Sequence, residues 1–246
     1  MTGEALALPM THARPVAPAG IDLRCCSVEA MLDDLDAKTG GEWGGAGLVH
    51  ADPPWVYDNA GTRGNADDQY ALLGIPEIVA HLARAGLVAG DGSRLACWVT
   101  GPMLVPFVWA CRDMGAAWPW EPLGAGAWGK QGQLGVGDHW RGDSEILTLW
   151  RRGSPPTLAR DLSNLHLSRR DQHSAKPIGW LRHMLRAWTE PGTSGPSGTV
   201  LELYAGLGSM ARACAAEGRR YVGAEIDAAR HADAMGLLAG MVGCRL

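Results

Sequence analysis

Apolar runs of strand length alternate with helical patterns along most of this chain. The runs lie at residues 22–26, 47–51, 94–100, 199–203 and 221–224. Between them, helical patterns begin at Pro76, extend over 102–114 and 177–188, and are expected to start again near Ser209. Strands that alternate with helices are typical of a parallel sheet covered on both faces. The pattern therefore predicts an α/β fold.

Two longer strand-like segments, 117–130 and 145–150, flank a glycine-rich turn at 132–142. This arrangement predicts an antiparallel hairpin at one end of the sheet. Residues 1–20 are rich in Ala, Pro and Thr and show no periodicity. We expect them to form a flexible tail before a single domain that spans 21–246.

Size and composition fit one globular enzyme domain. A chain of 246 residues with 46% hydrophobic residues can bury a sizeable core. No apolar run reaches bilayer length, and the N-terminus lacks a basic start followed by an apolar stretch, so we expect a cytoplasmic protein without membrane span or signal peptide. The six cysteines show no Cys-x-x-Cys spacing and the eight histidines form no cluster. Neither a disulfide framework nor a metal site is expected.

The charge is distributed unevenly. The net charge is −4, but nine Lys and Arg face four Asp and Glu between Arg141 and Arg186, which gives that segment +5 and leaves −9 for the rest. A basic segment on an acidic body can bind phosphates. It predicts a substrate-contacting insertion around 131–172, although a solvated arginine-rich face explains the same charges equally well.

The run at 47–51 ends in Asp52-Pro53-Pro54-Trp55. A buried strand that ends in an acid and two prolines delivers a rigid loop to the carboxyl edge of the sheet, where open α/β sheets bind ligands. The Asp52 carboxylate and the Pro53 carbonyl are then two acceptors aimed at one point, with the flat ring of Trp55 beside them. Such a cradle suits a planar base that carries an exocyclic amine.

A second group of residues follows the strand at 199–203. Gly206 and Gly208 allow a ligand to approach the backbone closely, and Glu225, 19 positions after Gly206, can accept hydrogen bonds from ribose hydroxyls. This spacing predicts a cofactor that contains a nucleoside. Because Ala211 completes a G-x-G-x-x-A pattern, the turn alone leaves a nicotinamide or flavin dinucleotide open. Too little chain follows Glu225 for a second mononucleotide-binding half, which favours S-adenosylmethionine.

Together these residues resemble the adenine-N6 methyltransferases, a family typified by the mRNA adenosine methyltransferases and their phage and bacterial relatives. Asp-Pro-Pro-Trp is followed by Tyr57, Asn59 and Arg63, and the run from Glu202 to Ser209 resembles methyltransferase motif I. His173-Ser174-Ala175-Lys176-Pro177 matches the His-Ser-x-Lys-Pro element of the family. The acidic motif precedes the glycine-rich one by about 150 residues, which is the permuted order of the β class.

The resemblance implies a Rossmann-like, S-adenosylmethionine-dependent methyltransferase that modifies N6 of adenine. It assigns catalysis to Asp52, Pro53, Pro54, Trp55 and Tyr57. It assigns cofactor binding to Asp52, Lys176, Glu202, Tyr204, Gly206, Gly208, Ser209 and Glu225. In this picture Asp52 and the Pro53 carbonyl accept the amine hydrogens, Trp55 or Tyr57 stacks on the base, and Lys176 lies near the methionine carboxylate.

The implied partner is a nucleic acid whose target base is flipped out or single-stranded. Expected substrate contacts come from Asn59, Arg63, Lys130, Trp140, Arg141, Arg169 and Arg170. The Gly206-Leu207-Gly208 turn follows the bacterial pattern, which favours DNA over RNA. N6-adenosine methylation of RNA and a catalytically inactive nucleic-acid-binding subunit remain alternatives. Cytosine N4 is disfavoured because cytosine enzymes of this class more often carry Ser-Pro-Pro. The oligomeric state stays open.

Overall fold

The structure is a computed structural model, and it describes residues 17–56, 72–132, 142–169, 175–192 and 195–243. The strands are β1 (Ile21–Cys25), β2 (Leu48–Ala51), β3 (Ser93–Val99), β4 (Glu121–Lys130), β5 (Ser144–Arg152), β6 (Leu165–Ser168), β7 (Thr199–Glu202) and β8 (Arg220–Glu225). The helices are α1 (Val28–Ala37), α2 (Ile75–Ala89), α3 (Gly101–Asp113), α4 (Ile178–Trp188), α5 (Ser209–Glu217) and α6 (Ala228–Gly243), with short 3-10 turns at Gly115–Ala117 and Pro196–Gly198.

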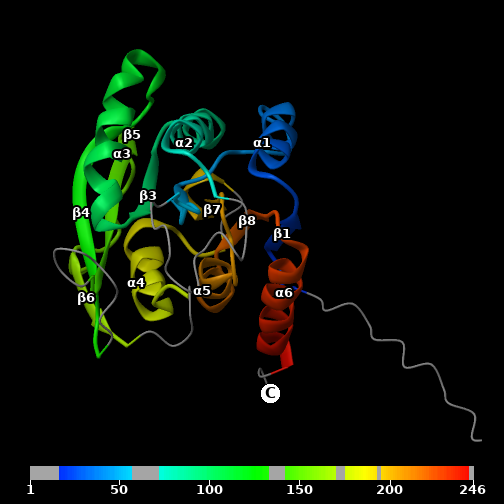
Figure 1. The fold of residues 1–246 in the computed structure, drawn as a ribbon. Coiled ribbons are helices and arrows are strands. Elements are labelled where there is room, and N and C mark those ends of the chain that lie inside the picture. The colour runs from blue at the N-terminus through cyan, green and yellow to red at the C-terminus, as the bar shows by residue number, and fades with distance from the viewer. Residues whose placement is uncertain (1–16, 57–71, 133–141, 170–174, 193–194, 244–246) are drawn as a thin grey trace, which may run out of the picture.

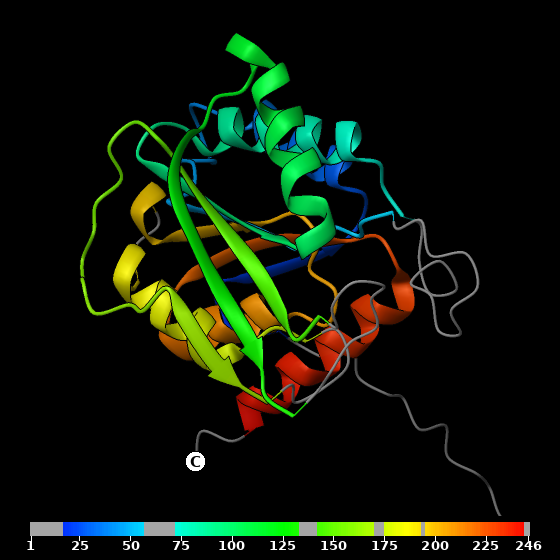
Figure 2. The same ribbon diagram turned by 60° about the vertical axis from the view of Figure 1, so that its left-hand side comes forward.

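The strands form one mixed sheet in the order β1-β8-β7-β2-β3-β5-β4-β6. Strand β5 pairs antiparallel with both β3 and β4, while the other neighbouring strands pair in parallel. The predicted antiparallel pairing of the two long strands is therefore confirmed (Figure 2). Strand β6 has no counterpart in the sequence prediction, and it takes the sheet edge beside β4 that the hairpin was expected to occupy.

Helices cover both faces of the sheet (Figure 1). On one face α1, α2 and α3 bury a core that includes Leu32, Leu82 and Phe107. On the other face α4, α5 and α6 pack over a second core, with Leu185 and Met210 among its members. The predicted α/β fold class is thus confirmed. In the described ranges no helix is long and apolar enough to cross a membrane.

The segment expected to be an insertion contains part of the sheet. Strand β5 lies between β3 and β4 and therefore belongs to the core of the sheet, and β6 also falls within 131–172. The remaining described stretch of that range connects these two strands. The basic residues of the segment are consequently distributed over strands and loops of the domain itself.

The connections leave β2 and β7 in opposite directions, although these two strands are neighbours. From β7 the chain continues into α5 and then β8, whereas from β2 it continues into α2 and then β3, on the other face and the other side of the sheet. The strands stay paired to their ends, where the Leu203 N–H donates to the His50 carbonyl at 3.1 Å. A reversal of this kind opens a crevice at the carboxyl ends of the two strands, the usual ligand site of open α/β sheets.

Candidate functional site

A cavity of about 370 Å³ lies at this crevice, and both groups of residues singled out from the sequence line it. The end of β2 contributes Asp52, Pro53 and Pro54, and the turn after β7 contributes Tyr204 and Gly206. Small-molecule sites in proteins usually have volumes of about 300–1,000 Å³. Two segments that are about 150 residues apart in the chain therefore face one ligand-sized space.

Lys176 connects the two sides of the cavity. Its ammonium donates to Asp52 Oδ2 at 2.5 Å and lies 3.1 Å from Glu145 Oε2. It also lies over the ring of Trp98, 5.2 Å from the centroid. Burial alone would lower the pKa of Lys176, but the two carboxylates outweigh burial and raise it. The lysine is therefore held as a cation in contact with Asp52.

Glu145 at the start of β5 is a site residue that the sequence analysis missed. It accepts hydrogen bonds from both Lys130 and Lys176. Burial tends to raise its pKa, but the two lysines lower it to about 2. Nothing in the local pattern marks Glu145, because its partners come from β4 and from the segment before α4.

Lys130 was expected to contact the substrate. In the structure its side chain is 11% exposed, and its ammonium pairs with Glu145 and lies over the Trp128 ring. This placement puts Lys130 behind Glu145 in a chain of alternating charges that ends at Asp52. Its contact with substrate stays a prediction.

Glu225 and Gly206 are brought together by the glycine-rich turn. Gly206, with φ +53°, donates its N–H to Glu225 Oε2 at 2.7 Å, and the Asp227 N–H donates to Oε1 at 2.9 Å. Burial raises the pKa of Glu225, while these two backbone hydrogen bonds act in the opposite direction. The carboxylate is thereby fixed beside the turn, at the position expected for a ribose acceptor.

The other two residues of this turn differ in their roles. Ser209 lines the cavity, and its Oγ accepts a hydrogen bond from the Lys176 backbone N–H at 3.3 Å. Gly208 precedes α5 with φ +70°, and a Cβ added there would lie 3.3 Å from the Cβ of Ala234 in α6. The glycine at 208 is therefore explained by backbone conformation and by packing against α6, while Gly206 is the glycine on the cavity wall.

Glu202 lies beneath the cavity with 2% of its surface exposed. Trp98 donates its indole N–H to His50 Nε2 at 2.9 Å, so His50 carries its proton on Nδ1 and donates it to Glu202 Oε1 at 2.7 Å. The Tyr221 hydroxyl donates to the other oxygen of Glu202 at 2.5 Å. An imidazole and a phenol thus hold the two oxygens of this buried side chain, which forms part of the cavity lining.

Trp55 forms part of the cavity wall and is held within the core. Only 4% of its surface is exposed, and its indole N–H donates to the Trp98 carbonyl at 3.2 Å. Its ring makes a T-shaped contact with the Phe107 ring, with 5.6 Å between the ring centroids. Its stacking on a base stays a prediction. Trp98 of β3 is both buried and part of the cavity lining.

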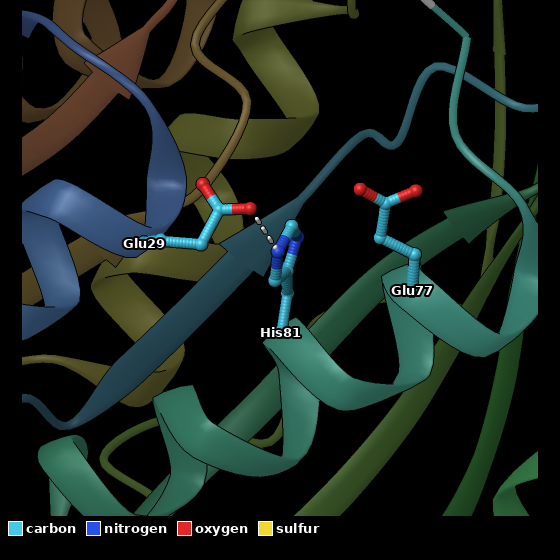
Figure 3. Close-up of side chains that lie close together, drawn as sticks. All are labelled: Glu29, Glu77 and His81. Carbon is cyan, nitrogen blue, oxygen red and sulfur yellow. Dashed lines mark hydrogen bonds and ion pairs between the residues drawn. The ribbon is translucent and has the colours of Figure 1, made fainter.

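A further group connects α1, α2 and the glycine-rich turn. His81 Nε2 bonds Glu29 Oε1 at 2.8 Å, its Nδ1 bonds the Tyr204 hydroxyl at 2.8 Å, and Glu77 lies alongside (Figure 3). Ligand atoms of Glu29, Glu77 and His81 lie within 4.8 Å of one another, as a metal ion would require. However, both imidazole nitrogens already have protein partners and both glutamates are exposed. We therefore interpret this group as a hydrogen-bonded network.

Several expected substrate contacts lie outside the described residues. These are Asn59, Arg63, Trp140, Arg141 and Arg170, and Tyr57, which was expected to take part in catalysis, also lies outside them. Arg169, directly after β6, is exposed. Many of the other basic residues counted between Arg141 and Arg186 form ion pairs: Arg151 with Glu121, Arg152 with Asp91, and both Arg182 and Arg186 with Glu217. In the described part of that segment, Arg160 and Arg169 are exposed and form no ion pair.

No protein-family model matches the sequence, and no curated protein matches it either. Solved structures do match. M1.HpyAVI in complex with SAM has a TM-score of 0.62 at 14% identity, over 88% of this chain and 99% of that one. A putative DNA modification methylase from Thermus thermophilus, complexed with S-adenosyl-L-methionine, has a TM-score of 0.62 at 16% identity, over 91% and 95%.

The cytosine-N4-specific PvuII DNA methyltransferase has a TM-score of 0.61 at 12% identity, over 92% of this chain and 95% of its own. All three matches extend over nearly the whole of both chains. At these identities they establish the fold, and the predicted Rossmann-like methyltransferase fold is confirmed.

Proposed function

We propose that this protein transfers a methyl group from S-adenosylmethionine to N6 of adenine in DNA. One observation carries the proposal: Asp52 after β2, Gly206 in the turn after β7 and Glu225 at the end of β8 line one cavity, and Lys176 bonds Asp52 there. A shared cavity is what we expect if the Asp52 loop holds the substrate amine and the glycine-rich turn holds the methyl donor. Two solved structures of this fold contain S-adenosylmethionine, which supports the choice of cofactor.

The charge of the cavity supports a cationic cofactor. Its lining includes six carboxylates, those of Glu29, Asp52, Glu77, Glu145, Glu202 and Glu225, against the basic side chains of Lys176 and Arg230. S-adenosylmethionine carries a sulfonium and an ammonium group, which carboxylates attract, and it has no pyrophosphate to repel them. A dinucleotide would instead bring two negative phosphates into this acidic space.

The geometry provides the acceptors that amine methylation needs. The lone pair of an adenine amine is delocalised into the ring, so N6 becomes nucleophilic only when its N–H groups are drawn away from the ring plane. We expect the Asp52 carboxylate, 31% exposed, and the Pro53 carbonyl, which already accepts from the Trp55 N–H at 3.0 Å and has a second lone pair, to accept these two hydrogens. Lys176 holds Asp52 in place from the side. Preorganised groups of this kind contribute about 3–4 kcal/mol each to the transition state.

The choice of base and polymer rests on the motifs. The cavity itself would admit either an adenine or a cytosine amine, and one structure of the same fold is a cytosine-N4 enzyme. Asp52, where cytosine enzymes more often carry serine, favours adenine. The Gly206-Leu207-Gly208 pattern and the DNA methyltransferase names of the matching structures favour DNA.

The test combines binding with product analysis. Calorimetry should show S-adenosylmethionine binding, and ligand at a hundredfold its Kd should stabilise the protein by about 2.7 kcal/mol. Single- and double-stranded DNA and RNA of one sequence are then incubated with radiolabelled cofactor and digested to nucleosides. N6-methyldeoxyadenosine is the expected product. Label found only in N4-methylcytosine would contradict adenine as the target base, and label found only in RNA would contradict DNA as the substrate. Tighter binding of a dinucleotide than of S-adenosylmethionine would overturn the methyltransferase proposal.

A further inference from the structure

His81 is the centre of a hydrogen-bonded chain that ends at the glycine-rich turn. It belongs to α2, it is 8% exposed, and each of its ring nitrogens has a partner from another element. Glu29 of α1 lies on one side and Tyr204, the residue that follows Leu203 after β7, on the other. All three residues line the cavity. A polar side chain so deeply buried rarely bridges three elements without a role in fixing one of them.

The turn is a segment that needs to be fixed. Gly206 and Gly208 both have positive φ, +53° and +70°. Glycines of this kind allow the required path, but they also leave the unbound turn many alternative conformations. Tyr204 lies two positions before Gly206, and the centroid of its ring is 6.2 Å from that of His81, with the ring planes tilted by 40°. Holding its hydroxyl restricts the start of the turn.

The hydrogen bond between His81 and Glu29 has a fixed direction, whereas the bond to Tyr204 can run either way. The carboxylate of Glu29 has its pKa lowered by its own backbone N–H, by Ser27 and by His81, so it acts as an acceptor for His81 Nε2–H. In neutral His81 the other nitrogen then accepts from the Tyr204 hydroxyl, and in charged His81 it donates to the same oxygen. Because a hydroxyl can do either, the link to Tyr204 persists in both states of the imidazole.

We propose that His81, held by Glu29, is a positioning residue that orders Tyr204 and the cofactor turn before the ligand binds. The consequence for S-adenosylmethionine rests on the proposed function, whereas the ordering itself does not. A turn that is ordered in advance loses less conformational entropy on binding. The network should therefore act on cofactor affinity and leave the rate of the bound complex nearly unchanged.

The cofactor-free experiment measures amide hydrogen exchange in the peptide that contains Gly206 and Gly208. Their N–H groups bond Glu225 and the Ala205 carbonyl, so exchange reports directly on the turn. We expect several-fold faster exchange in both His81→Leu and Tyr204→Phe. Arg84→Ala is the matched control, because Arg84 joins the same two helices through Asp33 but makes no contact with Tyr204. Unchanged exchange in His81→Leu, with folding confirmed by circular dichroism, would overturn the proposal.

The second experiment is a double-mutant cycle on cofactor affinity. Each single change should weaken S-adenosylmethionine binding by about two- to tenfold, the net value of one hydrogen bond. The double variant should be no weaker than the poorer single, because both changes remove the same link. His81→Gln, which can accept from Tyr204 and donate to Glu29, should recover part of the affinity. Fully multiplicative losses would contradict the proposal, while a wild type that fails to bind the cofactor would count against the proposed function alone.

Discussion

At the residue scale, the site is built from a row of alternating charges. Asp52, Lys176, Glu145 and Lys130 follow one another in contact. Each buried lysine is compensated by a carboxylate, which is the condition under which buried charges are tolerated. The row ends at Asp52, the member that is most exposed to the cavity. Its carboxylate is thus held by Lys176 at the cavity wall.

The Asp52→Asn variant should retain the fold and lose methyl transfer by about 10²-fold or more. An amide of the same shape can turn its NH₂ group toward the substrate amine, and one acceptor then becomes a donor. Turnover is measured at saturating cofactor, with circular dichroism as the check on folding. Asp113→Asn, at an exposed acid that ends α3, is the control and should leave turnover unchanged. Near-normal turnover in Asp52→Asn would show that Asp52 is only a turn residue.

The sequence analysis identified cavity residues that belong to recognisable motifs. It missed cavity residues whose partners are distant in the sequence. Asp52, Lys176, Gly206 and Glu225 were predicted to form one site, and all four line the same cavity. Glu145, His81 and His50 were missed. His81, for example, acquires its role from Tyr204, 123 positions away, and such partners leave no local pattern. Spacing can indicate a ligand-binding turn, but it carries no information about which isolated polar residue will fold against it.

At the element scale, the prediction succeeded where apolar residues are concentrated. The buried strands β2, β3 and β7 have every residue buried, so their apolar runs are unmistakable. Strand β6 was missed because it is four residues long and alternates exposed with half-buried positions. Its leucines at 165 and 167 are the exposed ones, 53% and 57%, so its hydrophobic pattern points outward. Only pairing with β4 makes it a strand.

Helix packing gives the same substitution opposite effects in two helices. Ala normally stabilises a helix over Gly by about 1 kcal/mol. In α2, however, a Cβ at Gly86 would lie 2.8 Å from both Pro119 and Trp120, whose indole N–H already bonds the Leu82 carbonyl. We expect Gly86→Ala to lower the free energy of unfolding by about 1–3 kcal/mol, as overpacking does. Gly236→Ala in α6, where nothing lies within 4 Å, should raise it.

Urea unfolding of both variants and the wild type measures the two effects under identical conditions. The contrast separates packing from propensity, because the two changes add the same methyl group to the same kind of backbone. Stabilisation by Gly86→Ala would contradict this prediction. It would show that α2 can move away from Trp120 to make room for the added methyl group.

At the scale of the whole molecule, fewer arginines of the segment 141–186 are free of ion pairs than its charge of +5 suggests. The net charge is −4, and most of the arginines around β5 and α4 are bound to glutamates or aspartates of the same domain. A phosphate has to compete with the carboxylate that each of these arginines already contacts. Among the described residues of 141–186, the exposed Arg160 and Arg169 form no ion pair, and we expect phosphate contacts there first.

Arg169 and its neighbour Arg170 are then the most informative positions. Arg169 is exposed just beyond β6 and forms no ion pair among the described residues, so it is free to contact a phosphate. If both arginines do so, changing them to alanine should weaken oligonucleotide binding and flatten the slope of log affinity against log salt by about one unit per lost contact. Fluorescence anisotropy between low and physiological salt measures that slope.

Two comparisons make this result specific. Cofactor affinity should stay unchanged, because Lys176 reaches the cavity through the later segment before α4. Arg112→Ala, at an exposed arginine of α3 paired with Asp113, removes one charge from another helix and should leave the salt slope as it was. An equal effect of both changes would mean that net charge alone acts on binding. An unchanged salt slope in the Arg169 and Arg170 variant would show that these arginines contact no phosphate, because only neutralised phosphates release counterions. The nucleic-acid surface would then lie elsewhere on the molecule.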